Sequence, residues 1–224
     1  MEARGLTGGF YWLCLWITRL AYLNILWIGF SLAGFVIFGL FPSTAGMFSV
    51  TRKWVAGEPD VAVFGVFWTT FKKEFMKSNM IGFIYFILGI ILLLDLKYFS
   101  SQQGLIYQAI TIAILTLSAG YMVSALYIFP VFVHYEAKML QHIKNSILIA
   151  VALPARTIAM GVGCLGLIFT ILYFPKLLLF FSGSLLSLLI MKSAYLSFER
   201  VEQLKSKPER DLEKRLEQRT VLPN

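Results

Sequence analysis

Long apolar runs, interrupted by short polar segments, dominate this 224-residue chain. A helix needs roughly 20 apolar residues to cross the hydrocarbon of a bilayer, and in lipid a helix satisfies all of its own backbone hydrogen bonds. The pattern therefore predicts an all-α fold, a polytopic membrane helix bundle in a single membrane domain (1–198) followed by a charged helical tail (199–224). Five stretches are long enough to be transmembrane helices: 20–41, 80–96, 105–133, 157–174 and 177–198.

The first span is expected to end at Phe41-Pro42, because a residue that precedes proline disfavours helical geometry. Ser43 and Thr44 could then cap a new helix. Cations and an indole at the end of a span are typical of the membrane–water boundary. The predicted interfacial anchors are Arg52, Lys53, Trp54, Lys72 and Lys73.

Between residues 60 and 79 the aromatic residues recur at helical spacing on one face, with lysines elsewhere on the wheel. This pattern predicts an amphipathic helix in the membrane interface. The aromatic face either attaches the segment to the membrane or docks on a partner. The candidate partner-binding residues are Phe64, Phe67, Trp68, Phe71 and Phe75.

The tail alternates in charge, with Asp211 and Arg215 spaced for an i, i+4 pair. Leu204, Leu212 and Leu216 add a thin apolar stripe. We predict a solvated helical tail, with a partner-binding strip as the alternative.

Charge fixes the expected orientation. The chain is 58% hydrophobic and only 14% charged, with a net charge of +8. In a soluble protein this excess would suggest nucleic acid as a partner, but in a membrane protein the positive-inside rule explains it, so no nucleic-acid partner is expected.

One orientation places segments 42–79, 134–156 and 191–224 inside the cell. These segments hold all of the 20 Lys and Arg residues except Arg4, Arg19, Lys97 and Lys176. The carboxyl terminus is therefore expected in the cytoplasm, and an odd number of spans places the amino terminus outside. Arg4 and Arg19 favour the inside, however, and residues 10–17 could instead lie in the inner interface.

Few polar features occur within the spans. Residues 161–166 match the GxGxxG dinucleotide pattern, but they lie inside an apolar span, where no nucleotide phosphate belongs. Ala159, Gly163 and Gly166 instead predict a small-residue face for close helix packing. Asn24 and Ser118 are better explained by contacts between helices than by a substrate path.

No constellation of catalytic or metal-binding residues is present in the sequence. His134 and His142 lack a third ligand, and Cys14 and Cys164 lie in separate apolar segments without metal or disulfide spacing. We therefore expect no metal, no cofactor and no enzymatic activity.

The segment from Glu136-Ala137 to Leu153-Pro154 has the spacing of the cytoplasmic coupling loop of binding-protein-dependent permeases. Lys138 and His142 replace an alanine and a glycine of that pattern. The match is therefore limited to a dipeptide at each end.

Three blocks, 24–58, 60–75 and 129–154, resemble the YesL family of bacterial integral membrane proteins, a family without an assigned function. The resemblance extends to about Phe198. Because members tend to be encoded beside oligosaccharide import systems of Gram-positive bacteria, it implies a plasma-membrane accessory subunit that associates with a sugar ABC permease. An independent small transporter or channel, and a membrane assembly or scaffold factor, are the alternatives.

Overall fold

The computed structural model describes the backbone of residues 6–220 and the side chains of residues 8–203 except residue 178. All regular secondary structure in this part of the chain is helical. The eight helices are α1 (Leu6–Ala33), α2 (Leu40–Val55), α3 (Val63–Lys73), α4 (Phe75–Ser100), α5 (Leu105–His134), α6 (Met139–Ala152), α7 (Pro154–Tyr173) and α8 (Pro175–Thr220). The tail is thus a continuation of α8, although the predicted stripe (Leu204, Leu212, Leu216) and the Asp211–Arg215 pair lie outside the described side chains.

Five segments are long and apolar enough to cross a membrane: Gly8–Ala33, Phe75–Ser100, Leu105–His134, Pro154–Tyr173 and Leu179–Gln203. Their length and composition imply a lipid bilayer as the environment and a multi-pass topology. The predicted all-α polytopic fold is therefore confirmed. The four later segments overlap the predicted spans 80–96, 105–133, 157–174 and 177–198.

The first predicted span, 20–41, has the wrong boundaries. Helix α1 already ends at Ala33, and the chain reverses through residues 34–39, where Phe35 (φ 53°) and Val36 (φ 63°) adopt left-handed geometry that a helix cannot continue through. A Cβ on Gly34 would lie 2.4 Å from the backbone of Gly39, and a Cβ on Gly39 would lie 2.5 Å from the carbonyls of Phe30 and Ser31, so both positions need glycine. Pro42 lies in the first turn of α2, where its missing N–H is not needed.

Helix α2 occupies the centre of the molecule, with α1, α3, α4, α5 and α8 packed around it. Its 16 residues span about 24 Å. Small and hydroxyl residues suit this position because they allow neighbouring helices to approach closely. A Cβ on Gly46, for example, would lie 3.1 Å from the ring of Phe67 on α3.

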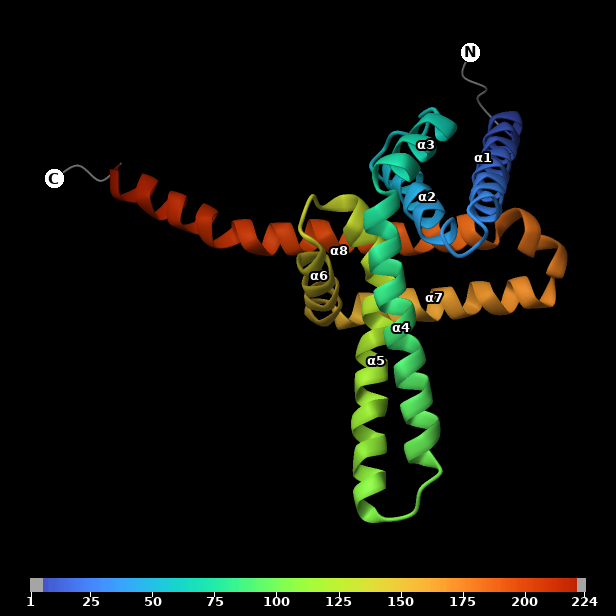
Figure 1. Ribbon diagram of the computed structural model, residues 1–224. Coiled ribbons are helices and arrows are strands. Elements are labelled where there is room, and N and C mark those ends of the chain that lie inside the picture. The colour runs from blue at the N-terminus through green and yellow to red at the C-terminus, as the bar shows by residue number, and fades with distance from the viewer. Residues whose placement is uncertain (1–5, 221–224) are drawn as a thin grey trace.

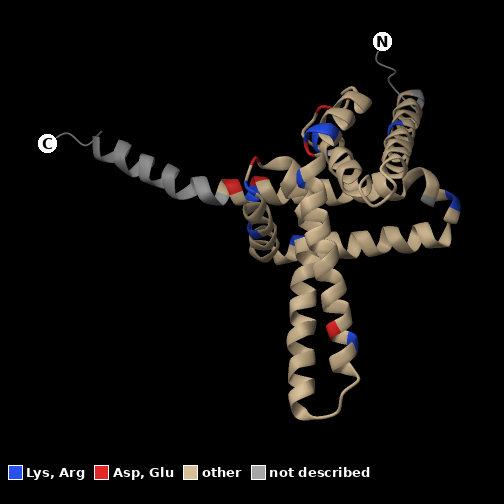
Figure 2. Cartoon of the chain, viewed as in Figure 1, with Lys and Arg blue, Asp and Glu red and all other residues tan. Residues whose placement is uncertain are grey.

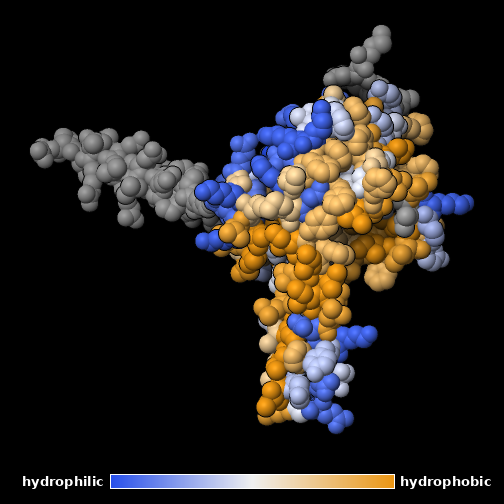
Figure 3. Space-filling model, in the orientation of Figure 1, coloured by the Kyte–Doolittle hydropathy of each residue, from blue (hydrophilic) through white to orange (hydrophobic). Residues whose placement is uncertain are grey.

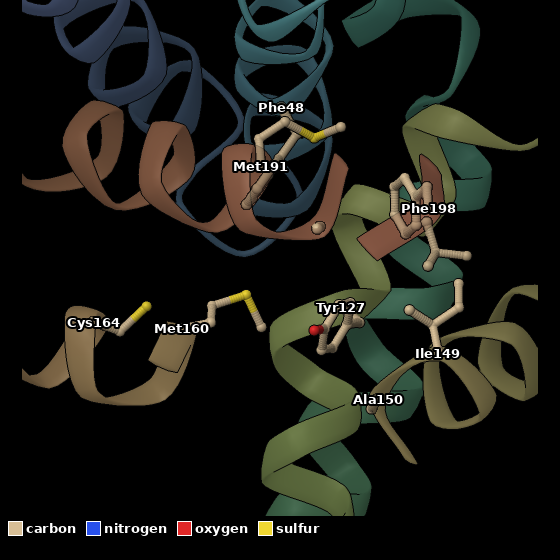
Figure 4. Close-up of a cluster of buried hydrophobic side chains, with 10 residues drawn as sticks. Phe48, Tyr127, Ile149, Ala150, Met160, Cys164, Met191 and Phe198 are labelled. Atoms are coloured by element: carbon tan, nitrogen blue, oxygen red, sulfur yellow. The ribbon is translucent and has the colours of Figure 1, made fainter. Parts of the chain in front are cut away.

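The largest buried cluster joins five helices, as Figure 4 shows. Phe48 of α2 and Tyr127 of α5 meet Met160 of α7 and Met191 and Phe198 of α8. Ile149 and Ala150 add a contribution from α6. Helices from both halves of the sequence, α2 and α5 to α8, therefore share one core.

Helices α4 and α5 form a long hairpin whose far half projects from the rest of the molecule, whereas α7 and α8 run across it (Figure 1). Apolar residues cover most of the hairpin (Figure 3), and many of them are exposed, including Ile87, Leu93, Leu94, Ile106 and Ile112. In a membrane, lipid would contact these side chains. Charged residues are instead concentrated around α3 and α6, away from the tip of the hairpin (Figure 2), although α4 also carries Asp95 and Lys97.

Candidate functional site: a basic cleft beside α2

A cleft of about 690 Å³ opens at this charged end of the molecule. It is bounded by the carboxyl-terminal half of α2, the α3–α4 junction, the end of α5 and the α5–α6 connection. Four basic side chains line it, against two acidic ones. They are Arg52, Lys73, Lys77 and Lys138, with Glu74 and Glu136.

Arg52 is fixed in the wall of the cleft by the end of α5. Its guanidinium donates to the carbonyl of Val133 at 2.6 Å and to that of His134 at 3.4 Å. The last carbonyls of a helix lack partners within the helix and carry the negative end of its dipole, so a cation is favoured there. This contact joins α2 to α5.

The α3–α4 junction supplies the second wall. Glu74 connects the two helices, and its carboxylate lies 3.9 Å from Lys73 Nζ and 3.5 Å from Lys77 Nζ. Both lysines are largely exposed, and pairs of this kind contribute at most about 1 kcal/mol. Thr70 of α3 donates to Ser49 of α2 at 2.9 Å, which ties this wall to the central helix.

Two histidines complete the cleft. His142 is only 4% exposed and packs edge-on against Phe132, with ring centroids 5.3 Å apart. Burial is the main cause that lowers the pKa of His142. The Ala137 carbonyl raises this pKa, the charge of Lys77 lowers it, and the charge of Glu74 raises it, but these effects are smaller. The ring is therefore neutral at pH 7.

His134 stacks close to Phe198, with centroids 4.5 Å apart, and contacts Tyr135. The Nδ1 atoms of His134 and His142 are both buried without a hydrogen-bond partner among the described residues. Those residues also contain no group of three or more His, Cys, Asp or Glu side chains that could hold a metal ion. The cleft thus offers cations, hydroxyls and imidazoles, which suit binding of an anion.

The predicted partner-binding residues, four on α3 and Phe75 at the start of α4, mostly contact other residues of the protein itself. Phe67 is 0% exposed, and Phe30 of α1 packs against Phe64, Phe67, Trp68 and Phe71 with centroid distances of 5.1 to 6.4 Å. Phe75 in turn packs edge-on against Phe71. Phe64 remains 47% exposed, so the part of this face that a partner could still reach is smaller than predicted.

The predicted interfacial anchors also divide into two groups. Arg52 is held by α5 as described, and Trp54 is 5% exposed and packs edge-on against Trp16 at 5.4 Å, so both have partners within the protein. Lys53 pairs with Glu58 at 3.1 Å, and Lys72 lies 4.8 Å from the Trp68 ring centre. An interfacial role stays a prediction for Lys53, Lys72 and Lys73.

The small-residue face of α7 is only partly used within the chain. A Cβ on Gly163 would lie 3.2 Å from Leu189 of α8, whereas Gly166 has open space around its Cα and Ala159 is exposed. The buried side chains of α7 are Thr157, Met160, Cys164 and Ile171. These larger residues, rather than the glycines, form most of its contact with the core.

Several polar side chains within the spans join two helices, while others, such as Thr111 and Thr170, bond to the backbone of their own helix. Asn24 bonds to the backbone of α8, as predicted from its position, and Tyr127 of α5 shares a hydrogen bond of 3.1 Å with Thr157 of α7. Tyr85, Ser124 and Ser146 form a buried hydroxyl network between α4, α5 and α6. Their hydrogen-bonding capacity is thus used for assembly of the helices.

Comparison with known proteins identifies a family for this chain. Residues 20–96 match the family described as "Protein of unknown function, DUF624". No solved structure matches the chain.

Three proteins of Bacillus subtilis (strain 168), each described as uncharacterized, are similar over most of their length. YesL is 41% identical over 87% of this chain and 91% of its own length, and YteU is 35% identical over 94% of both chains. YesV is 36% identical over 88% of this chain and 94% of its own. The chain therefore belongs to the YesL-like family of integral membrane proteins of unassigned function.

Proposed function

We propose that this protein is a non-catalytic accessory subunit of the bacterial plasma membrane that associates with an ABC-type oligosaccharide importer. The observation that carries the proposal is the separation of polar groups. Several polar side chains inside the spans hold helices together, whereas four basic and two acidic side chains line one cleft. This arrangement suits a protein that binds partners at its polar end, while the link to oligosaccharide uptake rests on the resemblance to the YesL family.

We also propose that the cleft faces the cytoplasm, because that end carries most of the basic residues. Arg19 pairs with Asp60, and Trp16 packs against Trp54, so the amino-terminal part of α1 lies at the cleft end. Phe198 of α8 lies against His134 at the same end. These contacts support a cytoplasmic location for both termini, because α2 returns the chain from the turn at residues 34–39 to the cleft end and so adds a sixth pass to the five spans. The external amino terminus predicted from five spans is the alternative.

Co-purification tests the proposed function. The tagged chain is purified from native membranes in mild detergent, and permease subunits of a sugar importer are expected among the proteins recovered. The double variant Phe64→Ala/Lys72→Ala changes the exposed part of α3 and should lower that recovery. The matched variant Phe169→Ala/Lys176→Ala, on exposed positions of α7 and α8, should leave it unchanged.

Phe67 is unsuitable for this test, because removing a fully buried ring would change the fold as well as the surface. Absence of importer subunits from the wild-type preparation would refute the proposed association. Equal recovery with both double variants would refute the role of α3.

A further inference from the structure

We propose that the basic cleft beside α2 is a binding site for the phosphate group of an anionic ligand. This inference goes beyond the proposed function, because it concerns the isolated chain and needs no partner protein. It rests on the charge of the cleft, on how its walls are fixed, and on two buried imidazoles.

The charge of the cleft is the first argument. Its four basic side chains exceed its two acidic ones, and one of those acids, Glu74, already lies within 4 Å of two lysines. Lys138 comes from the opposite wall, on the α5–α6 connection. Cations from separate elements therefore converge on one concave space, which raises the local concentration of anions.

The walls are fixed before any ligand binds. Arg52 is held by the α5 carbonyls, and Thr70 is bonded to Ser49, so α2, α3 and α5 keep their relative positions. A site whose groups are already ordered loses less entropy when it binds. A volume of about 690 Å³ falls within the range usual for small-molecule sites.

The third argument is that two buried histidine nitrogens in the cleft lack a hydrogen-bond partner among the described residues. Buried polar atoms almost always have a hydrogen-bond partner, yet Nδ1 of His134 and Nδ1 of His142 have none among the described residues. Both residues line the same cleft. A neutral imidazole carries one N–H donor, which an anion oxygen that enters the cleft could accept.

Phosphate fits this donor set better than a carboxylate does. A phosphate group presents at least three strong acceptor oxygens in different directions, and charge-assisted hydrogen bonds from Lys and Arg to it are strong. The hydroxyls of Thr69 and Thr70 and the amide of Gln141 line the same space as further donors. Such a group could come from a soluble phosphorylated compound or from the headgroup of an anionic lipid.

Two measurements on the purified full-length chain distinguish these sources. Isothermal titration in neutral detergent uses inorganic phosphate and glycerol 3-phosphate as soluble probes. Native mass spectrometry after solubilisation from phosphatidylglycerol-containing nanodiscs measures retained lipid. Each is repeated with Lys73→Gln/Lys138→Gln, which removes two exposed cleft cations, and with Lys144→Gln/Lys176→Gln, which removes two exposed lysines outside the cleft.

Saturable binding of the soluble probes, weakened about fivefold or more in the cleft variant and unchanged in the control, supports a soluble ligand. Retention of phosphatidylglycerol by the wild type and the control, but not by the cleft variant, supports a lipid headgroup. The proposal is overturned if the wild type shows neither saturable binding nor retention. It is also overturned if the two double variants lose binding equally.

Discussion

The contact between Asn24 and α8 should contribute a measurable part of the stability of the fold. Asn24 is 0% exposed, and its amide donates to the carbonyl of Leu179 at 2.7 Å. Its side-chain oxygen accepts from the backbone N–H of Gly183 at 2.9 Å and of Ser184 at 3.1 Å. Leu179 and Gly183 are four residues apart, so Asn24 bonds to both members of a pair that would close one helical turn.

The expected effect of Asn24→Leu can be worked from these three bonds. Interhelical hydrogen bonds in membrane proteins contribute on average about 0.6 kcal/mol each, so their loss should cost about 2 kcal/mol. The backbone groups of Leu179 and Gly183 can bond to each other once Asn24 is gone, so they add no large penalty for unpaired atoms. Leucine and asparagine have the same number of side-chain heavy atoms, branched at the same carbon, so the substitution leaves no cavity. The methyl groups of leucine are bulkier than the amide atoms, so any overpacking adds to the loss.

Chemical denaturation in detergent micelles, followed by tryptophan fluorescence and by circular dichroism, measures this difference. Gln108→Leu is the matched control, because Gln108 is an exposed amide on α5. Its free energy of unfolding should stay within about 0.5 kcal/mol of the wild type. If Asn24→Leu is no less stable than Gln108→Leu, the three hydrogen bonds of Asn24 to α8 do not stabilise the fold.

Three further variants test other parts of the structure. Gly183→Ala should destabilise the chain by about 1 to 3 kcal/mol, because its Cβ would lie 3.1 Å from both Asn24 Oδ1 and the Trp27 ring; equal stability to the wild type would contradict the close approach of α1 and α8. Phe67→Ala should cost about 3 to 5 kcal/mol and Phe64→Ala much less, since only Phe67 is fully buried; similar losses in thermal unfolding would contradict this. The folded state lowers the pKa of His142, so the unfolded state binds more protons and stability falls as pH drops below about 6.5; the stability difference between wild type and His142→Gln should therefore shrink from pH 7.5 to 5.5, and parallel pH profiles would contradict it.

The sequence pattern predicted the four later spans, but not the boundaries of the first span or the central position of α2. The spans in α4, α5, α7 and α8 are recognisable because long apolar stretches have few other uses. A new helix capped by Ser43 and Thr44 was predicted, but α2 begins at Leu40 without a side-chain cap, and its central position was not predicted. Protein surrounds α2, so it can carry Ser, Thr and Gly and be only 16 residues long. The turn at residues 34–39 was missed because it is as apolar as a span, and its only signal was the pair Gly34 and Gly39.

The candidate site could not be assembled from spacing along the chain. Arg52 and Val133 are 81 positions apart, and only the packing of α2 against α5 brings them together. Arg52 and Trp54 have the composition of an interfacial anchor whether they face lipid or protein, so burial alone distinguishes the two roles. His134 and His142 carried no signal as metal ligands, and their shared cleft depends on the turn between α5 and α6.

Cysteine labelling measures whether the cleft end of the protein faces the cytoplasm, as we propose. In a Cys14→Ser/Cys164→Ser background, single cysteines are placed at Lys72, beside the cleft end of α3, and at Gln102, in the α4–α5 loop. Whole cells are then treated with a membrane-impermeant maleimide. We expect Gln102→Cys to be labelled on intact cells and Lys72→Cys only after the cells are permeabilised. Labelling of Lys72→Cys on intact cells would show that the cleft end faces outward.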